Sequence, residues 1–343
     1  MLPGKVKVDI DYIAMKLGLA KSTVSKAMNG RPNISAATRE KVRALAAKLN
    51  YVPDRLAQSL KTKRSYLIGL VMHEMKRDFF IEIARGVTLE AQRNGCQAVF
   101  ASSEGSTENE RALVRDFLSR RIDGLVVIPC IGGDHSHLQE VALGGYPLVI
   151  ADNYVEGVDA PFVGTDFELG GYLAVKHLVK NGHRHLGLLL GPRDLPSTPE
   201  RLAGYTRAME ESGLRLDPER VRYGDYSFAA GRAAAEALLA EFPETTAILC
   251  GNADLSEGAA AALAKLGKRV PDDLCLMDFG GARLPSVNQK NEEIGQAAAR
   301  TLFRLINGET PARRNIVKPE IAVMGHSSSD ISPWGTAPLE EKG

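Results

Sequence analysis

Four short or cationic side chains lie close together near the N-terminus: Lys21, Ser22, Ser25 and Lys26. On a helix they share one side, opposite the apolar residues of the same segment. Hydroxyl and ammonium groups suit contacts with base edges and phosphates better than they suit a hydrophobic core. This stretch therefore predicts a nucleic-acid-binding surface.

Two other stretches carry groups that could serve catalysis or metal binding. Asp134-His135-Ser136-His137 contains paired histidines, and His326 precedes three serines. Neither contains a Gly-x-Ser-x-Gly elbow or a His-Glu-x-x-His helix, and neither has a carboxylate at ligand spacing. The chain also lacks a phosphate-binding Gly-x-x-x-x-Gly-Lys-Ser/Thr loop. We expect no enzymatic activity, no cofactor and no metal site.

The four cysteines are Cys96, Cys130, Cys250 and Cys275. They are widely spaced and fall mostly in apolar, strand-like runs. We expect buried free thiols rather than disulfides or a metal cluster.

Two short helices must position the basic cluster. Ile10, Ile13, Ala14 and Leu17 have the spacing of one helical face, and Gly18 then permits a sharp turn. A second helix begins at Lys21 or Ser22 and should bury Val24, Ala27 and Met28. A third should begin after the capping Ser35, with a buried stripe of Val42, Leu45, Ala46 and Leu49. The order helix, glycine turn, helix is that of a helix-turn-helix.

This segment resembles the LacI/GalR family of bacterial transcription regulators. The matching residues are Ile13-Ala14, Leu17-Gly18-Leu19, Thr23-Val24-Ser25, Asn29, Thr38-Arg39, Tyr51, Pro53, Ala57 and Leu60. The chain departs from the family pattern at Ala20, Lys26 and Asp54. The resemblance implies a DNA-binding domain followed by a hinge helix.

On this basis we expect the following DNA-contacting residues: Lys21, Ser22, Thr23, Ser25, Lys26, Asn29, Asn33, Arg39, Tyr51, Arg55, Ala57 and Leu60. Lys21 and Ser22 should lie nearest the bases. The segment from Pro53 to Leu60 is too short to form a stable helix alone, so it should order only on DNA. The family uses the leucine that matches Leu60 as a minor-groove wedge.

Charge is unevenly distributed along the chain. Residues 1–64 carry a net charge of +10, whereas the remaining 279 residues carry −9. A basic head on an acidic body is typical of a nucleic-acid-binding module attached to another domain. The alternative is a solvated charged face on an ordinary helical domain.

From residue 66 onward, short apolar strands alternate with amphipathic helices. The pattern predicts strands at Tyr66 to Met72, Gln97 to Ala101, Leu125 to Ile128, Leu148 to Ala151, Leu186 to Leu190, Ala247 to Cys250 and Leu274 to Phe279. Such alternation indicates parallel sheets covered by helices. The predicted fold class is α/β: a three-helix N-terminal domain with a hinge helix, then two doubly wound parallel-sheet subdomains with a ligand crevice between them.

The family resemblance extends to about residue 330, through segments such as Arg121-Ile122-Asp123-Gly124 and Arg201-Leu202-Ala203-Gly204-Tyr205. It implies a core related to periplasmic sugar-binding proteins. The expected domains are a helix-turn-helix domain at 1–50, a hinge and linker at 51–65, and a core at 66–343. Within the core, the N-subdomain spans about 66–165 and 287–314, and the C-subdomain spans about 166–286 and 315–330.

Candidate effector-binding residues follow from strand-to-helix junctions and from the resemblance: His73, Phe79, Phe80, Asp166, Arg201, Tyr226 and Asp278. A phenylalanine ring could stack on a sugar or base, and Arg201 could hold a hydroxyl or phosphate. Core packing is the alternative for Phe79 and Phe80, and a surface loop is the alternative for Asp166 and Tyr226.

The chain leaves the family pattern at three places in this core. Gly280 stands where an effector-binding aspartate is usual, so that acceptor is absent unless Asp278 takes over. Met324 replaces a usual arginine, and the segment from Asn252 to Gly258 is irregular. We expect either an effector other than a neutral sugar, such as an anionic metabolite held by Arg201, or weak effector control.

The resemblance implies a repressor that binds a near-palindromic operator as a homodimer and responds to a sugar, sugar phosphate or nucleobase. The dimer should form through helix faces such as Phe80 to Val87 and Thr107 to Leu118. The tail from Asp330 has no leucine heptads for a tetramer. The chain lacks a membrane span and a signal peptide, so we expect a cytoplasmic protein. The alternatives are a soluble sugar-binding protein and an effector-independent DNA-binding regulator.

Overall fold

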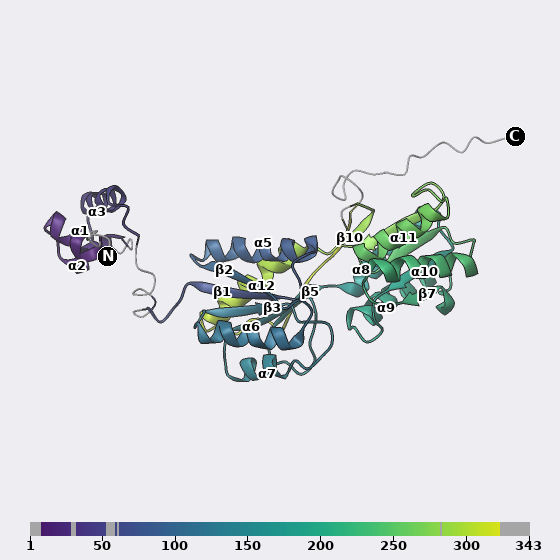
Figure 1. Ribbon diagram of the computed structural model, residues 1–343, viewed down its shortest axis with the longest axis horizontal. Coiled ribbons are helices and arrows are strands. Elements are labelled where there is room, and N and C mark those ends of the chain that lie inside the picture. Colours follow the sequence, from purple (N-terminus) through teal and green to yellow (C-terminus); the bar gives the residue numbers. More distant parts are fainter. Residues whose placement is uncertain (1–7, 29–31, 53–58, 60–61, 282, 323–343) are drawn as a thin grey trace, which may run out of the picture. The chain divides into compact units, whose positions relative to one another are not determined.

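The computed structural model describes residues 8–28, 32–52, 59, 62–281 and 283–322. The chain divides into two compact units, Met1–Ser65 and Tyr66–Gly343 (Figure 1). Among the described helices, none is long and apolar enough to cross a membrane.

The described residues of the first unit include the helices α1 (Ile10–Leu17), α2 (Lys21–Met28) and α3 (Ala36–Lys48). Asp9 caps α1 by accepting a hydrogen bond from the Tyr12 amide, and Ser35 caps α3 through the Thr38 amide. Gly18 ends α1 at φ 63°, a left-handed conformation that glycine adopts without steric cost. The predicted Ser35 cap and the glycine turn are confirmed.

A small core holds these helices together. Its buried members are Ile13, Ala14, Val24, Ala27, Val42 and Ala46. Ile10, Leu17, Met28, Leu45 and Leu49, predicted to be buried, are only partly so. The core uses only one face of each helix, so polar residues can occupy the exposed faces.

The second unit contains two six-stranded sheets within the described residues, one in each lobe. The N-lobe strands are β1 (Leu67–Met72), β2 (Gln97–Ser102), β3 (Gly124–Val127), β4 (Leu148–Ala151), β5 (Phe162–Thr165) and β11 (Arg314–Val317). The C-lobe strands are β6 (Leu186–Leu190), β7 (Val221–Tyr223), β8 (Ala247–Cys250), β9 (Cys275–Phe279), β10 (Ser286–Asn288) and β12 (Glu320–Ala322).

The two sheets have corresponding strand orders. The N-lobe order is β11-β5-β4-β3-β1-β2, and the C-lobe order is β12-β10-β9-β8-β6-β7. All neighbouring strands are parallel except β10 and β12, which pair antiparallel. The predicted fold class, two doubly wound parallel sheets after a helix-turn-helix unit, is confirmed.

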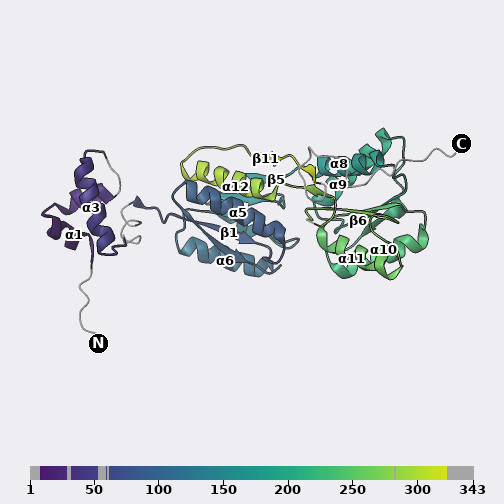
Figure 2. The same cartoon turned by 90° about the horizontal axis from the view of Figure 1, so that it is seen from above.

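Helices cover both faces of each sheet, as Figure 2 shows for the N-lobe. In the N-lobe, α5 (Asp78–Arg93) and α12 (Asn291–Ile306) pack on one face, and α6 (Thr107–Ser119) and α7 (Ser136–Leu143) pack on the other. In the C-lobe, α8 (Phe167–Lys180) and α9 (Ser197–Glu211) lie opposite α10 (Phe228–Glu241) and α11 (Ala253–Lys265). A short 3₁₀ turn, η1 (Pro218–Arg220), precedes β7.

Three chain crossings join the lobes in the described part of the core. They connect β5 to α8, β10 to α12, and β11 to β12. The first and third are tied together, since the Asp166 amide donates to the Val317 carbonyl at 3.2 Å. These crossings place the carboxyl ends of strands from both sheets around one crevice.

Two segments singled out in the sequence are regular helices in the structure. Asn252 caps α11 by accepting from the Leu255 amide at 2.9 Å. In the segments proposed for dimerisation, several apolar residues pack inside the subunit, whereas Ile81 is exposed. Phe80, Ile83 and Val87 lie in one N-lobe core, and Val114 and Phe117 lie in the other.

Candidate functional site

The two lobes enclose a cavity of about 640 Å³. Six of the seven predicted effector residues line it: His73, Phe79, Phe80, Arg201, Tyr226 and Asp278. His73, Phe79 and Phe80 belong to the N-lobe, and the other three belong to the C-lobe. The cavity therefore brings together side chains that are far apart in the sequence.

Asp166 is the predicted residue that the structure places elsewhere. Its carboxylate caps α8 by accepting from the Leu169 amide at 2.8 Å, and it is not among the residues lining the cavity. A strand-to-helix junction needs such a cap, and this requirement explains the residue type without a ligand.

Arg201 is the most enclosed cation of the cavity, with 5% of its surface exposed. It lies in the second turn of α9, which begins at Ser197. Its guanidinium lies between the rings of Phe167 and Phe279, 4.6 and 4.5 Å from their centroids. Nη1 donates to the Tyr226 hydroxyl at 2.6 Å, whereas buried Nε has no hydrogen-bond partner. A buried donor without a partner is costly, so this group is prepared for a polar ligand.

Two of the carboxyl groups that line the cavity have raised pKa values. Asp278, 2% exposed, accepts from the Ser256 hydroxyl at 2.7 Å and the Gly281 amide at 3.0 Å. Burial outweighs these hydrogen bonds and raises the pKa of Asp278 to about 6. Burial also raises the pKa of Asp152 to about 6, although the Arg201 charge opposes that shift. Both groups can accept hydrogen bonds from a hydroxyl-bearing ligand.

Asp278 lies in the cavity two residues before Gly280. Gly280 has φ 75°, and a Cβ on Gly281 would lie 2.3 Å from the Asp278 carboxylate. Glycine therefore suits both positions of the turn that follows the aspartate. The strand β9 thus places a carboxylate in the cavity, directly before Phe279.

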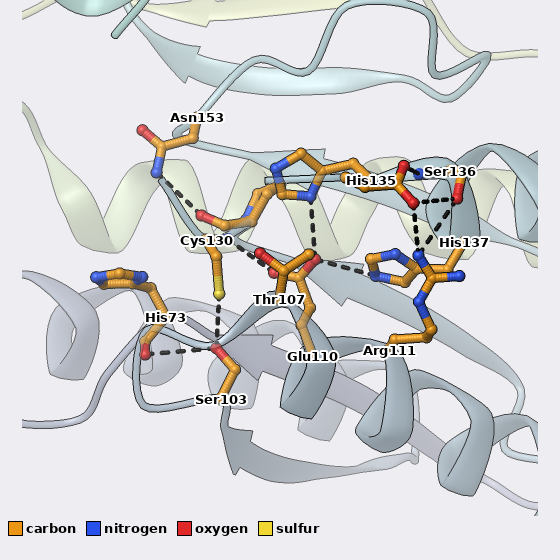
Figure 3. Close-up of polar contacts among 12 residues, drawn as sticks. His73, Ser103, Thr107, Glu110, Arg111, Cys130, His135, Ser136, His137 and Asn153 are labelled. Atoms are coloured by element: carbon orange, nitrogen blue, oxygen red, sulfur yellow. Dashed lines mark hydrogen bonds and ion pairs between the residues drawn. The ribbon is translucent and has the colours of Figure 1, made fainter. Parts of the chain in front are cut away.

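The N-lobe contributes a loop that follows β3 and is held by a buried carboxylate, as Figure 3 shows. Glu110 of α6 is fully buried and accepts from the Cys130 amide at 2.7 Å. His135 Nδ1 and His137 Nε2 lie 3.2 and 3.0 Å from the same carboxylate oxygen. Burial alone would raise the pKa of Glu110, but the close contacts of the two imidazoles and the hydrogen bond from the Cys130 amide lower it to about 2.

The paired histidines therefore have a structural role in this loop. Among the described residues, no group of His, Cys, Asp and Glu side chains is arranged to hold a metal ion. Burial raises the pKa of the Cys130 thiol to about 11, which keeps it protonated beside Ser103. All four cysteines are free and buried.

In the first unit, the basic cluster lies on the outer side of α2. Lys21, Ser22 and Lys26 are exposed, and Thr23 and Ser25 are partly exposed, while Val24 and Ala27 are buried. This arrangement confirms which face of the helix is available. The sequence did not indicate that Lys21 Nζ lies 2.7 Å from Asp11 Oδ2. The ammonium group of Lys21 therefore has an acidic partner on α1.

The other predicted DNA-contacting residues have different positions. Asn33 is exposed at φ 73°, Arg39 is partly exposed on α3, and Tyr51 packs against the helical core. Asn29, Arg55, Ala57 and Leu60 lie outside the described residues, as does most of the predicted hinge. Met324 and the C-terminal tail also lie outside them.

Several cavity residues were missed by sequence reasoning: Asp152, Ser197, Asn252, Asp254 and Gln289. One signal was available, because the polar pair Asp152-Asn153 directly follows the apolar strand β4. The remaining residues lie at helix starts or before a helix, where a polar residue equally indicates a cap.

Each of the two structural units matches a family model of known proteins. Residues 9–54 match the family model described as bacterial regulatory proteins, lacI family. Residues 65–322 match periplasmic binding proteins and sugar binding domain of LacI family. The regulator CelR of Thermobifida fusca is 31% identical over 320 residues, covering 88% of this chain and 92% of its own.

Other relatives and solved structures agree. The ribose operon repressor of Haemophilus influenzae is 29% identical, covering 92% of this chain and 97% of its own. The lac repressor dimer bound to operator and an anti-inducer has a TM-score of 0.74 at 26% identity, covering 92% of this chain and 97% of that one. The CelR–cellobiose complex has a TM-score of 0.68 at 28% identity, covering 92% and 99%.

The relatives named here are transcriptional regulators rather than enzymes. With a helix-turn-helix unit matching one family model and a two-lobed core matching the other, the chain belongs to the LacI family of bacterial DNA-binding transcriptional regulators.

Proposed function

We propose that this protein is a repressor that binds a near-palindromic operator as a homodimer. Its affinity for the operator falls or rises when a small molecule occupies the crevice. The observation that carries the proposal is the combination, in one chain, of an exposed polar face on α2 with a buried, incompletely paired Arg201 in a two-lobed cavity. A plain sugar-binding protein would account for the cavity but not for α2.

Base reading is assigned to the start of α2. Replacing Lys21 and Ser22 together should change the preferred operator sequence, because each good base contact contributes about 1–3 kcal/mol of discrimination. Selection of binding sites from a random DNA library measures this preference. The matched control is Lys41→Ala, at an exposed position of α3, which should weaken binding to all DNA sequences alike. An unaltered preference in the double variant would contradict the assignment.

Minor-groove insertion is assigned to Leu60, as in the family. Paired leucines would unstack the central step of the operator and bend it. Leu60→Ala should therefore reduce both affinity and the bend angle measured by circular permutation of the selected site. A bend equal to that of the unmodified protein would exclude the wedge.

The homodimer is assigned to apolar residues that the N-lobe leaves exposed. Ile81 on α5 is 54% exposed, and Val99 and Phe100 on the edge strand β2 are each 37% exposed. Apolar side chains on helix and edge strand suit a two-fold contact with a second copy. Sedimentation should show a dimer, with Ile81→Lys and Phe100→Glu giving monomers. A stable tetramer at micromolar concentration would contradict this.

The effector is assigned to the sugar class, since Asp152 and Asp278 beside the enclosed guanidinium of Arg201 favour a neutral ligand with many hydroxyls. A solved relative, CelR, is a complex with cellobiose. A phosphorylated or otherwise anionic effector held by Arg201, a nucleobase, and effector-independent DNA binding remain the competing proposals. Thermal-shift screening should give its largest shift with an unmodified mono- or disaccharide. A larger shift with sugar phosphates would favour the anionic effector.

A further inference from the structure

We infer that Arg77 and Asp254 form a latch that holds the two lobes together across the mouth of the crevice and controls how often it opens. Arg77 lies between β1 and α5 in the N-lobe, and Asp254 lies in the first turn of α11 in the C-lobe. Arg77 Nε is 2.9 Å from Asp254 Oδ2. Both residues line the cavity, one from each lobe, and both side chains are partly exposed to solvent.

Arg77 makes a second contact with the C-lobe. Its Nη2 donates to the Tyr226 carbonyl at 3.5 Å, and the same carbonyl accepts from Asn252 Nδ2 at 3.4 Å. Asn252 Nδ2 also lies 3.4 Å from Asp254 Oδ2. The Arg77 guanidinium thus contacts a group of polar atoms from the segments at the starts of α10 and α11.

A same-lobe acid keeps the arginine in place. Glu74 Oε1 lies 2.7 Å from Arg77 Nε, a close ionic contact that lacks the alignment of a hydrogen bond. Because Glu74 and Arg77 belong to the same lobe, this contact survives when the lobes separate. Arg77 would then stay oriented toward the mouth and could pair again with Asp254 on closure.

The latch lies away from the three chain crossings that connect the lobes. Away from the three chain crossings, the hydrogen bond and ion pair that join the lobes in the described part of the core are those of Arg77. The crossings act as a hinge that both open and closed forms retain. The latch is the contact that opening breaks, so it shifts the balance between the two forms.

The expected effect is moderate, since the side chains of Arg77 and Asp254 are 36% and 34% exposed. A partly exposed ion pair of this kind shifts a two-state equilibrium by about fivefold at low salt. Salt should weaken the latch, because the Debye length falls to about 8 Å at physiological ionic strength. A modest latch suits a crevice that must exchange its ligand.

The test measures lobe separation directly in the full chain without any effector. The native cysteines in the described residues are buried, so spin labels can be attached to Glu140→Cys on exposed α7 and Ala229→Cys on α10. Labelled chains diluted into excess unlabelled chain report distances within one subunit by double electron–electron resonance. The unmodified latch should give a predominantly short distance.

Charge reversal distinguishes a latch from a general perturbation. Arg77→Glu should raise the open-to-closed ratio at least about fivefold, and adding Asp254→Arg should restore most of the closed population. Arg85→Glu is the matched control: it reverses a charge on α5 that pairs with Glu292 inside the N-lobe, and it should leave the distances unchanged.

Three outcomes would overturn the latch. They are an unchanged distribution in Arg77→Glu, a double variant as open as the single one, and an equal opening in Arg85→Glu. The milder Asp254→Asn, which keeps the cap segment intact, must also open the crevice. If Arg77→Glu unfolds, a closed distribution in Asp254→Asn still contradicts the inference.

Discussion

The two lobes have corresponding strand orders, yet each treats a buried charge differently. The N-lobe encloses the carboxylate of Glu110, and the C-lobe encloses the guanidinium of Arg201. Glu110 is surrounded by a backbone amide and two imidazoles. Arg201 has ring faces, one hydroxyl and an Nε without a partner.

We propose that the difference separates a structural charge, Glu110, from a ligand-binding charge, Arg201. Glu110 is already satisfied within the protein, so a ligand could add little, and its role is to hold the loop that follows β3. Arg201 has hydrogen-bonding capacity left over and faces a cavity. Burial of a charged group alone therefore does not indicate a ligand site. A buried charged group whose hydrogen-bonding capacity is not satisfied within the protein does indicate one.

The largest effect should come from removing the satisfied charge. Glu110→Leu should lower the free energy of unfolding by about 3–5 kcal/mol, because the Cys130 amide and both histidines lose their shared acceptor. Urea unfolding followed by circular dichroism measures this loss. A loss below about 1 kcal/mol would mean that the N-lobe charge is no more structural than Arg201.

The second test uses pH to compare the buried acids of the two lobes. The folded pKa of Asp278 is raised to about 6, so its protonated form favours folding, and that contribution is lost as pH rises from about 4 through 6. Asp278→Asn should thus be more stable than the unmodified protein at pH 7.5, by up to about 3 kcal/mol, and the gain should vanish near pH 4.

Glu110 should behave in the opposite way. Its folded pKa is lowered to about 2, so its contribution is present above its ordinary pKa and is lost as pH falls toward 2. Urea unfolding of Asp278→Asn between pH 4 and 8, and of Glu110→Gln between pH 2 and 5, each beside the unmodified protein, gives both profiles. Parallel profiles for the two variants would remove the distinction between the lobes.

The smallest effect on stability, with a clear effect on binding, is expected at Arg201. Arg201→Met retains much of the packing between Phe167 and Phe279 and removes a partly unpaired charge, so stability should change by less than about 1 kcal/mol. Effector affinity should fall about 10- to 100-fold. Titration with the best compound of the thermal-shift screen measures the affinity. Loss of stability without loss of affinity would make Arg201 a structural charge like Glu110.

Much of the fold follows from local patterns. The strands β4, β6 and β8 begin and end at the predicted residues, because uninterrupted apolar runs bounded by polar residues fit buried parallel strands. Other elements were missed. The helix α7 begins at Ser136, inside the stretch examined for paired histidines, and β11 is exposed over three of its four residues. Weak periodicity and an exposed edge leave little signal for either.

The candidate site was only partly predictable. A polar residue after a strand can cap a helix, as Asp166 does, or face a cavity, as Asp152 does. The local sequence is similar in the two cases. The choice depends on which side of the sheet edge faces the other lobe, and that is a property of the assembled core.

The sequence by itself determined the family, the helix-turn-helix outline with its glycine turn, the basic head and the alternating α/β core. These features depend on spacing and residue type, which are local. Only the tertiary structure decided that Asp278 enters the cavity, that Arg201 keeps an unpaired Nε, that Glu110 gathers two histidines and that Arg77 meets Asp254. Arg77 and Asp254, for example, lie 177 positions apart in the sequence. Such contacts are set by how the lobes pack, which no local pattern encodes.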